Sequence, residues 1–172
     1  MTSLSSFLIR QLTPADAEAF SALRRLVLAD NAVPMGLSME EELARPVQGF
    51  RDQLGYSEPN AAFGAFVGDV LVGSSAIAWP SKLGSSRHKA NLWGVFTAPG
   101  YRRQGISRAL VQHTIAHGRK YGLLRINLTV YVPNPEATKL YAQLGFTHNG
   151  TEPQSIYLDG SYYDGQYWSL PL

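Results

Sequence analysis

Apolar runs separated by polar turn signals divide the chain into strand-like and helix-like segments. The strand-like segments cover residues 7–12, 61–67, 70–78, 90–97 and 123–132, and residues 155–170 form a strand pair. The helix-like segments run from residue 13 to about residue 29, from residue 38 to a break at Pro46, from residue 105 to near residue 122, and from about residue 135 to residue 144. Because strands and helices alternate, the pattern predicts an α/β fold with a mixed sheet and helices on its faces.

Capping signals mark where the predicted helices begin and end. Thr13 stands directly before Pro14, which is typical of an N-cap followed by the first helical position. Ser38 and Glu41 have the spacing of a capping box, so a second helical stretch begins there. Gly145 follows the last helix-like segment and predicts its C-terminal end.

Turn signals predict how the strands connect. The pair Gly68-Asp69 separates two apolar strands, and Asp159-Gly160 lies within the strand pair at the C-terminal end, as expected for hairpins. The strand over 90–97, the long helix after it and the next strand form a crossover unit. Such a unit predicts two parallel strands.

Length and composition are those of one folded domain. The chain has 172 residues, of which 45% are hydrophobic and 16% charged, enough for a sizeable core and unlike a disordered segment. It has no cysteine, which excludes disulfides, thiolate metal sites and a thiol nucleophile, and which agrees with a reducing compartment. Residues 1–6 show no signal-peptide pattern, and no apolar run approaches membrane-spanning length. We therefore expect a single domain over residues 1–172 in a soluble, cytoplasmic protein without a membrane partner.

The charges are distributed unevenly along the chain. Residues 70–135 contain no Asp or Glu but nine Lys or Arg, whereas the flanks hold all 13 acidic residues and six basic ones. Such a distribution favours a polyanion near the middle of the chain. The alternative is that these charges scatter over a solvated surface in the folded protein.

The segment 95–107 combines an apolar strand, a basic turn with a glycine, and the start of a helix. The first turn of a helix leaves amide N–H groups without partners and carries the positive end of the helix dipole, so anions bind there. Gly105 has no side chain to keep a phosphate from these amides, while Arg102, Arg103 and Arg108 add positive charge. The segment predicts a pyrophosphate-binding loop; the alternative is a basic surface turn before an ordinary helix.

Two motifs resemble signatures of a known family. Residues 99–107, Pro-Gly-Tyr-Arg-Arg-Gln-Gly-Ile-Ser, are similar to the acyl-CoA pyrophosphate loop of the GNAT superfamily of N-acetyltransferases, Gln/Arg-x-x-Gly-x-Gly/Ala, with Ser107 in place of the last residue. Residues 134–146 are similar to the second signature, Asn-x-x-Ala-x-x-Leu-Tyr followed by Leu-Gly-Phe. The resemblance is close over residues 92–148 and implies a GNAT fold, whose mixed central sheet has splayed parallel strands and helices on both faces.

The resemblance also implies acetyl-CoA as cosubstrate and no metal. The pantetheine arm would lie in the gap between the strands at 92–97 and 127–132. The residues implied to bind the cofactor are Val95, Phe96 and Thr97 on the strand, Arg102, Arg103, Gln104, Gly105, Ile106, Ser107 and Arg108 in the loop, and Asn134 and Tyr141 in the second motif. Asn134 is in addition a candidate for capping its helix.

The chemistry implied by the resemblance is direct attack of an amine on the acetyl group. The Tyr141 hydroxyl would protonate the leaving thiolate as general acid, and a backbone N–H of the strand would polarise the carbonyl group. The chain departs from the family where many members carry a glutamate base. The matching positions hold Asn91 and Thr129, neither of which can take a proton.

The base therefore stays open among several groups. The candidates are the flank carboxylates Glu40, Glu41, Glu42, Glu152, Asp159 and Asp164, the imidazole of His88, and a water ordered by Asn91 and Thr129. We favour a water relayed past Asn91 as the catalytic route for this proton. Glu40 to Glu42 also fit a solvated helix start that the dipole favours. An acceptor of lower pKa than an alkylamine, whose pKa is about 10, would need less help.

We expect an N-acetyltransferase that acts on the primary amine of a small molecule. The alternatives are acetylation of a protein N-terminus or lysine, and a non-catalytic acyl-CoA sensor, which the missing strand carboxylates suggest. The expected partner is a small-molecule or peptide amine, not a nucleic acid, and the apolar tail strands are compatible with a homodimer.

For two further groups of residues we expect structural roles or a part in the acceptor pocket. His113 and His117 are four positions apart on the long helix and could share a metal, but no third ligand is evident, so we expect partly exposed helix residues. The tail carries Tyr157, Tyr162, Tyr163, Tyr167 and Trp168. These rings could stack on nucleic acid, but packing at a sheet edge or lining the amine pocket fits them better.

Overall fold

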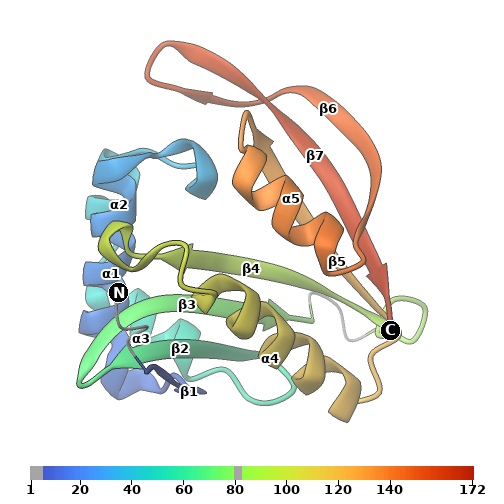
Figure 1. Cartoon of the computed structure of the whole chain (residues 1–172), viewed down its shortest axis with the longest axis horizontal. Coiled ribbons are helices and arrows are strands. Elements are labelled where there is room, and N and C mark those ends of the chain that lie inside the picture. The colour runs from blue at the N-terminus through green and yellow to red at the C-terminus, as the bar shows by residue number, and fades with distance from the viewer. Residues whose placement is uncertain (1–5, 80–82) are drawn as a thin grey trace.

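The computed structural model describes residues 6–79 and 83–172. Its strands form one mixed sheet, which helices flank (Figure 1). Residues 1–5, part of the segment in which the sequence shows no signal-peptide pattern, lie outside these ranges. The strands are β1 (Leu8–Gln11), β2 (Ala61–Val67), β3 (Val70–Ala78), β4 (Lys89–Thr97), β5 (Arg125–Val132), β6 (Thr147–Leu158) and β7 (Ser161–Pro171). Their order is β1-β2-β3-β4-β5-β7-β6, with β4 and β5 parallel and the other neighbours antiparallel. The predicted mixed sheet and crossover unit are confirmed.

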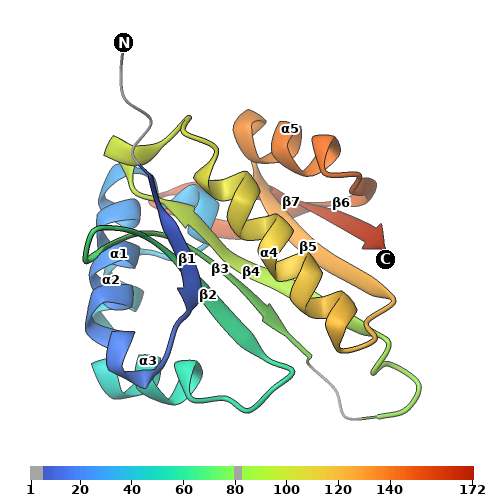
Figure 2. The same cartoon turned by 60° about the horizontal axis from the view of Figure 1, so that its bottom comes forward.

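Helices cover both faces of the sheet (Figure 2). The helices are α1 (Ala17–Asp30), α2 (Met39–Ala44), α3 (Val47–Leu54), α4 (Ile106–Lys120) and α5 (Pro135–Gln143), and single turns of 3₁₀-helix occur at η1 (Pro14–Asp16), η2 (Val33–Met35) and η3 (Pro99–Tyr101). Helices α1 and α3 share one apolar core, whereas α4 and Tyr141 of α5 belong to the other. None of the helices in the described ranges is long and apolar enough to cross a membrane.

The two cores explain the continuous apolar runs in the sequence. Along β2, Phe63 and Ala65 pack on the α4 side, whereas Ala62 and Phe66 pack on the α1 side. Successive side chains of a strand point to opposite faces, so a strand covered on both faces has to be apolar throughout. This is why the pattern at residues 61–67 shows no polar alternation.

The parallel strands β4 and β5 diverge, as the resemblance implies. They pair only from Lys89, opposite Arg125, to Asn91, opposite Asn127. Beyond this point β4 has a bulge, because the register against β3 shifts and Gly94 has a φ of 63°. The Ser74 hydroxyl donates a hydrogen bond of 2.7 Å to the Gly94 carbonyl and so holds the bulge. A bulge bends its strand and increases the twist, which carries the end of β4 away from β5.

Most of the predicted boundaries are confirmed. At the start of α2, the Ser38 hydroxyl accepts a hydrogen bond from the Glu41 N–H at 3.2 Å, and the Ser38 N–H donates one to the Glu41 carboxylate at 2.7 Å. Gly145 has a φ of 91° just after α5, and both residues of the Asp159-Gly160 turn have positive φ values. These are the conformations that the capping and turn signals predict.

Three boundaries differ from the prediction. The turn after Thr13 is a 3₁₀-helix, and the α-helix proper begins at Ala17. The break at Pro46 is followed at once by a new helix, since Pro46 serves as the N-cap of α3. Strand β6 begins at Thr147 rather than near Ser155. It is a mostly exposed edge strand that pairs with β7 through its backbone, so it lacks the apolar alternation that would have revealed it.

Candidate active site

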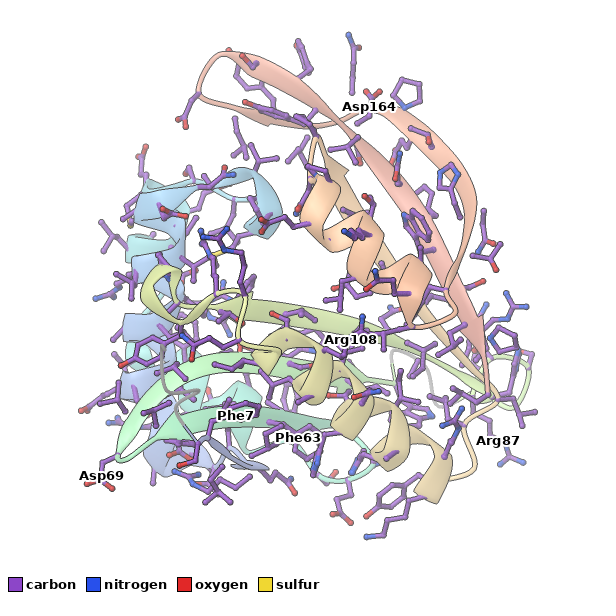
Figure 3. All side chains as sticks on the ribbon, viewed as in Figure 1. Phe7, Phe63, Asp69, Arg87, Arg108 and Asp164 are labelled. Atoms are coloured by element: carbon purple, nitrogen blue, oxygen red, sulfur yellow. The ribbon has the colours of Figure 1, made fainter. Side chains whose placement is uncertain are left out.

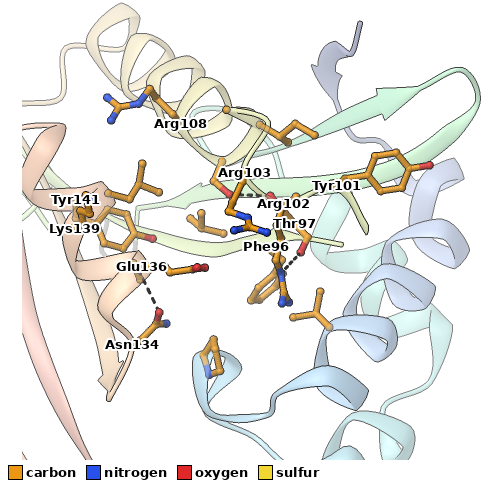
Figure 4. Close-up of a pocket in the computed structure, with 18 of the residues that line it drawn as sticks. Phe96, Thr97, Tyr101, Arg102, Arg103, Arg108, Asn134, Glu136, Lys139 and Tyr141 are labelled. Atoms are coloured by element: carbon orange, nitrogen blue, oxygen red, sulfur yellow. Dashed lines mark hydrogen bonds between the residues drawn. The ribbon is translucent and has the colours of Figure 1, made fainter. Parts of the chain in front are cut away.

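Two cavities lie where β4 and β5 diverge. The first, of about 540 Å³, is bounded by the end of β4, the start of α4, and α5 (Figure 4). The second, of about 670 Å³, is bounded mainly by β4, β5 and β7. Pro34, Val95, Phe96 and Tyr141 line both cavities. The two spaces therefore meet at the splayed strands, next to the Tyr141 ring.

The predicted anion loop forms part of the first cavity. Its lining includes Arg102, Arg103, Gly105, Ile106, Ser107 and Arg108, whereas Gln104 lines neither cavity. Gly105 is the N-cap of α4 and has a φ of 81°, and no side chain caps the helix. A Cβ added to Gly105 would meet no atom within 4 Å. The first turn of a 15-residue helix thus borders the cavity without a side-chain cap, the arrangement that binds phosphate groups.

The three loop arginines have different environments. Arg102 forms an ion pair of 2.7 Å with Asp30, and its Nε also donates to the Thr97 carbonyl. Arg108 donates a hydrogen bond to Gln143 and so ties α4 to α5 (Figure 3). Arg103 reaches into the first cavity (Figure 4). Of the three, Arg103 is best placed to meet an anion there, since each of the others already contacts another side chain.

Ser107, the residue that departs from the family pattern, makes a specific contact. Its hydroxyl and the hydroxyl of the buried Thr97 lie 2.7 Å apart and form a hydrogen bond. This bond joins the end of β4 to the first turn of α4. A glycine or alanine at position 107 would lack this hydrogen bond. Serine in place of the family residue therefore adds a link between β4 and α4 and remains a small side chain.

Tyr141 is buried at the meeting point of the cavities. Its side chain is 7% exposed, and its ring lies edge-on to Phe146 with the centroids 5.4 Å apart. Burial raises the pKa of Tyr141 far above its usual value, so the hydroxyl stays protonated at any ordinary pH. A protonated hydroxyl in this position can donate a proton but cannot act as a base.

Asn134 caps α5, which confirms the helix-capping role expected beside cofactor binding. Its Oδ1 accepts a hydrogen bond of 3.2 Å from the Ala137 N–H. Asn134 also lines the first cavity, opposite the anion loop (Figure 4). The cap fixes this side chain at the cavity wall, and its amide nitrogen is not used by the cap.

The second cavity contains Asn91 and Thr129, the two positions where the family often has glutamate. Both side chains are exposed, and Asn127, the register partner of Asn91, lies beside them in the lining. Two of the tail aromatics, Tyr167 and Trp168, also line this cavity. Of the other tail aromatics, Tyr157 and Tyr162 are 61% and 62% exposed and stack on each other near the end of the hairpin, with centroids 4.9 Å apart.

None of the candidate carboxylates lines the second cavity. Glu42 is 1% exposed, not solvated as the sequence suggests, because it accepts two hydrogen bonds of 2.6 and 2.8 Å from the buried Arg24. Glu152 accepts from the Tyr167 hydroxyl and from Ser155, and these bonds lower the pKa of Glu152. Among the described residues that line the second cavity there is no Asp, Glu or His.

The histidine pair on α4 has structural contacts. The rings of His113 and His117 lie edge-on to Phe63, and the Nε2 atom of His117 is 2.8 Å from the Pro59 carbonyl oxygen. Within residues 6–79 and 83–172, no three His, Cys, Asp or Glu side chains are grouped so that they could hold a metal ion. The arrangement of this pair is that of packed helix residues.

Comparison with known proteins identifies the family. Residues 21–146, most of the chain, match the model of the acetyltransferase (GNAT) family. The chain is 40% identical over 58 residues to the ribosomal protein bS18-alanine N-acetyltransferase of Escherichia coli K12, and 28% identical over 78 residues to the spermidine N(1)-acetyltransferase of Vibrio cholerae. These segments cover 34% and 45% of this chain and 39% and 45% of the relatives, so the chain spans less than half the length of either.

The fold is shared with solved acetyltransferases. A GNAT superfamily phosphinothricin acetyltransferase from Sinorhizobium meliloti, solved in complex with acetyl-CoA, superimposes with a TM-score of 0.80. The match covers 96% of this chain and 88% of that chain. At 18% sequence identity, this likeness shows a shared fold and nothing more. Because the family model spans most of the sequence and the sheet has the splayed strands of that fold, this chain belongs to the GNAT family of acetyltransferases.

Proposed function

We propose that this protein is an acetyl-CoA-dependent N-acetyltransferase that acts on the primary amine of a small molecule. The observation that carries the proposal is that two cavities meet between the diverging strands and share Tyr141. One cavity has the chemistry of an anion site, and the other opens toward the aromatic tail of the sheet. A donor and an acceptor entering from the two sides would meet at the Tyr141 hydroxyl.

The first cavity would hold coenzyme A by its diphosphate. The amides that follow Gly105 and the guanidinium of Arg103 would bind the phosphate oxygens, because both groups belong to residues that line the first cavity. Backbone groups near Val95 and Thr97 on the side of β4 that β5 leaves unpaired would bind the pantetheine arm, and the Asn134 amide would support its far side. When bound, acetyl-CoA supplies an acetyl thioester.

The chain's own groups would then handle the protons and the developing charge. A backbone N–H of the β4 bulge would donate to the carbonyl oxygen. The Tyr141 hydroxyl, held protonated by burial, would donate its proton to the departing sulfur. The proton of the amine would leave through water beside Asn91, since no carboxylate or imidazole lines that side among the described residues.

Two alternatives follow from specific observations. The Escherichia coli relative acts on the alanine of a ribosomal protein, which supports a protein α-amino group as acceptor. The lack of a carboxylate in the second cavity supports a sensor that binds acyl-CoA without turnover. One domain spanning the chain, a homodimer and a cytoplasmic location stay predictions.

The decisive experiment combines calorimetric titration of coenzyme A with thiol release from acetyl-CoA in the presence of small amines, amino acids and peptides. We expect coenzyme A to bind, and Tyr141→Phe to lower kcat about a hundredfold while leaving the coenzyme A affinity unchanged. Tyr157→Phe, at the exposed hairpin, is the matched control and should behave as wild type. Binding without turnover of any acceptor would favour the sensor. Full activity of Tyr141→Phe, under conditions where chemistry limits the rate, would remove Tyr141 as the acid.

A further inference from the structure

The described residues that line the second cavity are all uncharged. Its described lining contains no Asp, Glu, Lys, Arg or His. Aromatic residues line it from three strands, with Trp93 on β4, Tyr131 on β5 and Tyr167 on β7, whereas Trp168, also in the lining, pairs with Leu128 and packs against the core on the α4 side. At about 670 Å³ it is large enough for a molecule with a ring. The lining is therefore suited to a flat, uncharged body.

The polar groups of this cavity are neutral and lie along one line. Asn127, Thr129 and Tyr131 alternate along β5 and so share one face of the sheet, and Asn91 pairs with Asn127 from β4. Amide and hydroxyl groups both donate and accept hydrogen bonds. They can orient a neutral polar group of an acceptor, but they cannot neutralise a second ammonium or a carboxylate.

A charged acceptor would lose hydration in this cavity without gaining a counter-ion. A polyamine such as spermidine carries further ammonium groups, and a free amino acid carries a carboxylate. Glu152 is not in the lining, although by strand register it is on the same face of the sheet as Tyr131. Its carboxylate already accepts hydrogen bonds from the Tyr167 hydroxyl and from Ser155. The described lining therefore offers no oppositely charged side chain to a polyamine or to an amino acid.

The reactive nitrogen of the acceptor also has to be uncharged. It must hold a free electron pair to attack, so an ammonium has to lose a proton first. The titratable groups that face the cavity are the hydroxyls of Tyr131, Tyr141 and Tyr167, and Glu152 accepts a hydrogen bond from the last of these. A phenol hydroxyl in general is not a base at neutral pH. An amine bonded directly to an aromatic ring is already unprotonated there.

We infer, on the basis of the proposed acetyltransferase function, that the acceptor is a small aromatic amine whose nitrogen is neutral at physiological pH. The nitrogen would form the new bond to the acetyl carbon as the carbon–sulfur bond breaks. The sulfur leaves as a thiol with the proton from Tyr141, the nitrogen loses its extra proton to water beside Asn91, and a proton returns from water to the Tyr141 phenolate, so that no net proton is gained or lost. Because aromatic faces also attract cations, an arylalkylammonium of equal size is expected to bind but to react slowly.

The isomers para-toluidine and benzylamine test the inference directly. They contain the same atoms and one ring each, but only benzylamine is an ammonium at neutral pH. We expect kcat/KM for para-toluidine to be independent of pH from about pH 6 to about pH 8 and to exceed that of benzylamine at least tenfold at neutral pH, although free benzylamine is the stronger nucleophile. The value for benzylamine should rise about tenfold per pH unit as its free base forms.

Binding supplies a readout that does not depend on turnover. Trp93 lines the cavity, so occupancy should change the tryptophan fluorescence of the protein. We expect both isomers to do so, with spermidine and an alanine-terminated peptide at least tenfold weaker. A protein that binds spermidine or the peptide as tightly as the isomers would contradict the uncharged cavity.

A variant restores the missing base. Asn91→Asp places a carboxylate on the cavity floor and should shift the ratio of kcat/KM for benzylamine over para-toluidine at least tenfold toward benzylamine. Gln154→Glu adds the same charge on the exposed strand β6 and should leave the ratio unchanged. Thiol release that is fastest with spermidine, with the peptide or with benzylamine at neutral pH would overturn the inference but leave the acetyltransferase proposal standing. Coenzyme A binding without thiol release for any amine would overturn both.

Discussion

The substitution Gly105→Ala tests whether backbone amides hold the cofactor. Gly105 caps α4 with a φ of 81°, and its Cα faces the first cavity with no atom within 4 Å of an added Cβ. The new methyl group would therefore contact no part of the protein. It would stand over the amides where a phosphate oxygen is proposed to bind.

Two separate costs follow from this geometry. A left-handed backbone at a residue with a Cβ costs about 1 to 2 kcal/mol, which lowers the free energy of unfolding. Keeping a phosphate oxygen from one amide loses a hydrogen bond to a charged group, about 1.5 to 3 kcal/mol. The affinity for coenzyme A should thus fall about ten- to a hundredfold.

Gly68→Ala separates the two costs. Gly68 lies in the hairpin between β2 and β3, has a φ of 57°, and likewise has no atom within 4 Å of an added Cβ. Urea unfolding should show a similar loss of stability for both variants, while calorimetric titration should show weaker coenzyme A binding only for Gly105→Ala. Equal coenzyme A affinity in wild type and Gly105→Ala would refute the amide site.

Other parts of the fold lead to three further predictions. Glu42→Gln leaves Arg24 buried and without its counter-ion, so urea unfolding should show a loss of about 3 to 5 kcal/mol; a loss below about 1 kcal/mol would contradict this. Gly36→Ala places a Cβ 2.2 Å from Cε2 of Tyr131 and should raise the acceptor KM in thiol-release assays, and an unchanged KM would show that the Tyr131 ring does not shape the acceptor site. The Arg10 guanidinium holds the pKa of Asp16 at about 2 instead of 3.8, which stabilises the fold above the unfolded pKa and is lost as the pH falls toward about 2. Because Arg10 is 44% exposed, Asp16→Asn should cost only about 1 kcal/mol at neutral pH and nothing near pH 2, and a cost that does not change with pH would argue against this pair.

The features that the sequence predicts correctly are local. The capping box at Ser38, the start of the long helix at Gly105 and the cap by Asn134 each depend on residues within a few positions of one another. The same holds for the hairpin at Gly68 and for the end of α5 at Gly145. Such signals can be read in the sequence because the backbone groups that they satisfy are neighbours in it.

The features that sequence reasoning missed depend on distant residues. Glu42 looks like part of a solvated acidic helix start, but it pairs with Arg24, which lies 18 positions earlier in the chain. The approach of Gly36 to the Tyr131 ring joins η2 to β5 and could not be read from either segment. The neutral lining of the second cavity also became visible only when β4, β5 and β7 came together. For that lining, the signals in the sequence were the tail aromatics and the uncharged Asn91 and Thr129.

The buried pair of Arg24 and Glu42 matters to the site through Phe96. Replacing such a pair with apolar residues is often neutral or stabilising, so stability alone does not account for it. The Arg24 guanidinium lies 5.8 Å from the centroid of Phe96, one of the four residues that line both cavities, and Glu42 holds the guanidinium in that orientation. Because Phe96 follows directly after the bulge that diverts β4 from β5, the ion pair fixes the ring at the point where β4 is not held by β5. Its removal should therefore loosen the boundary between the donor and acceptor spaces before it loosens the sheet.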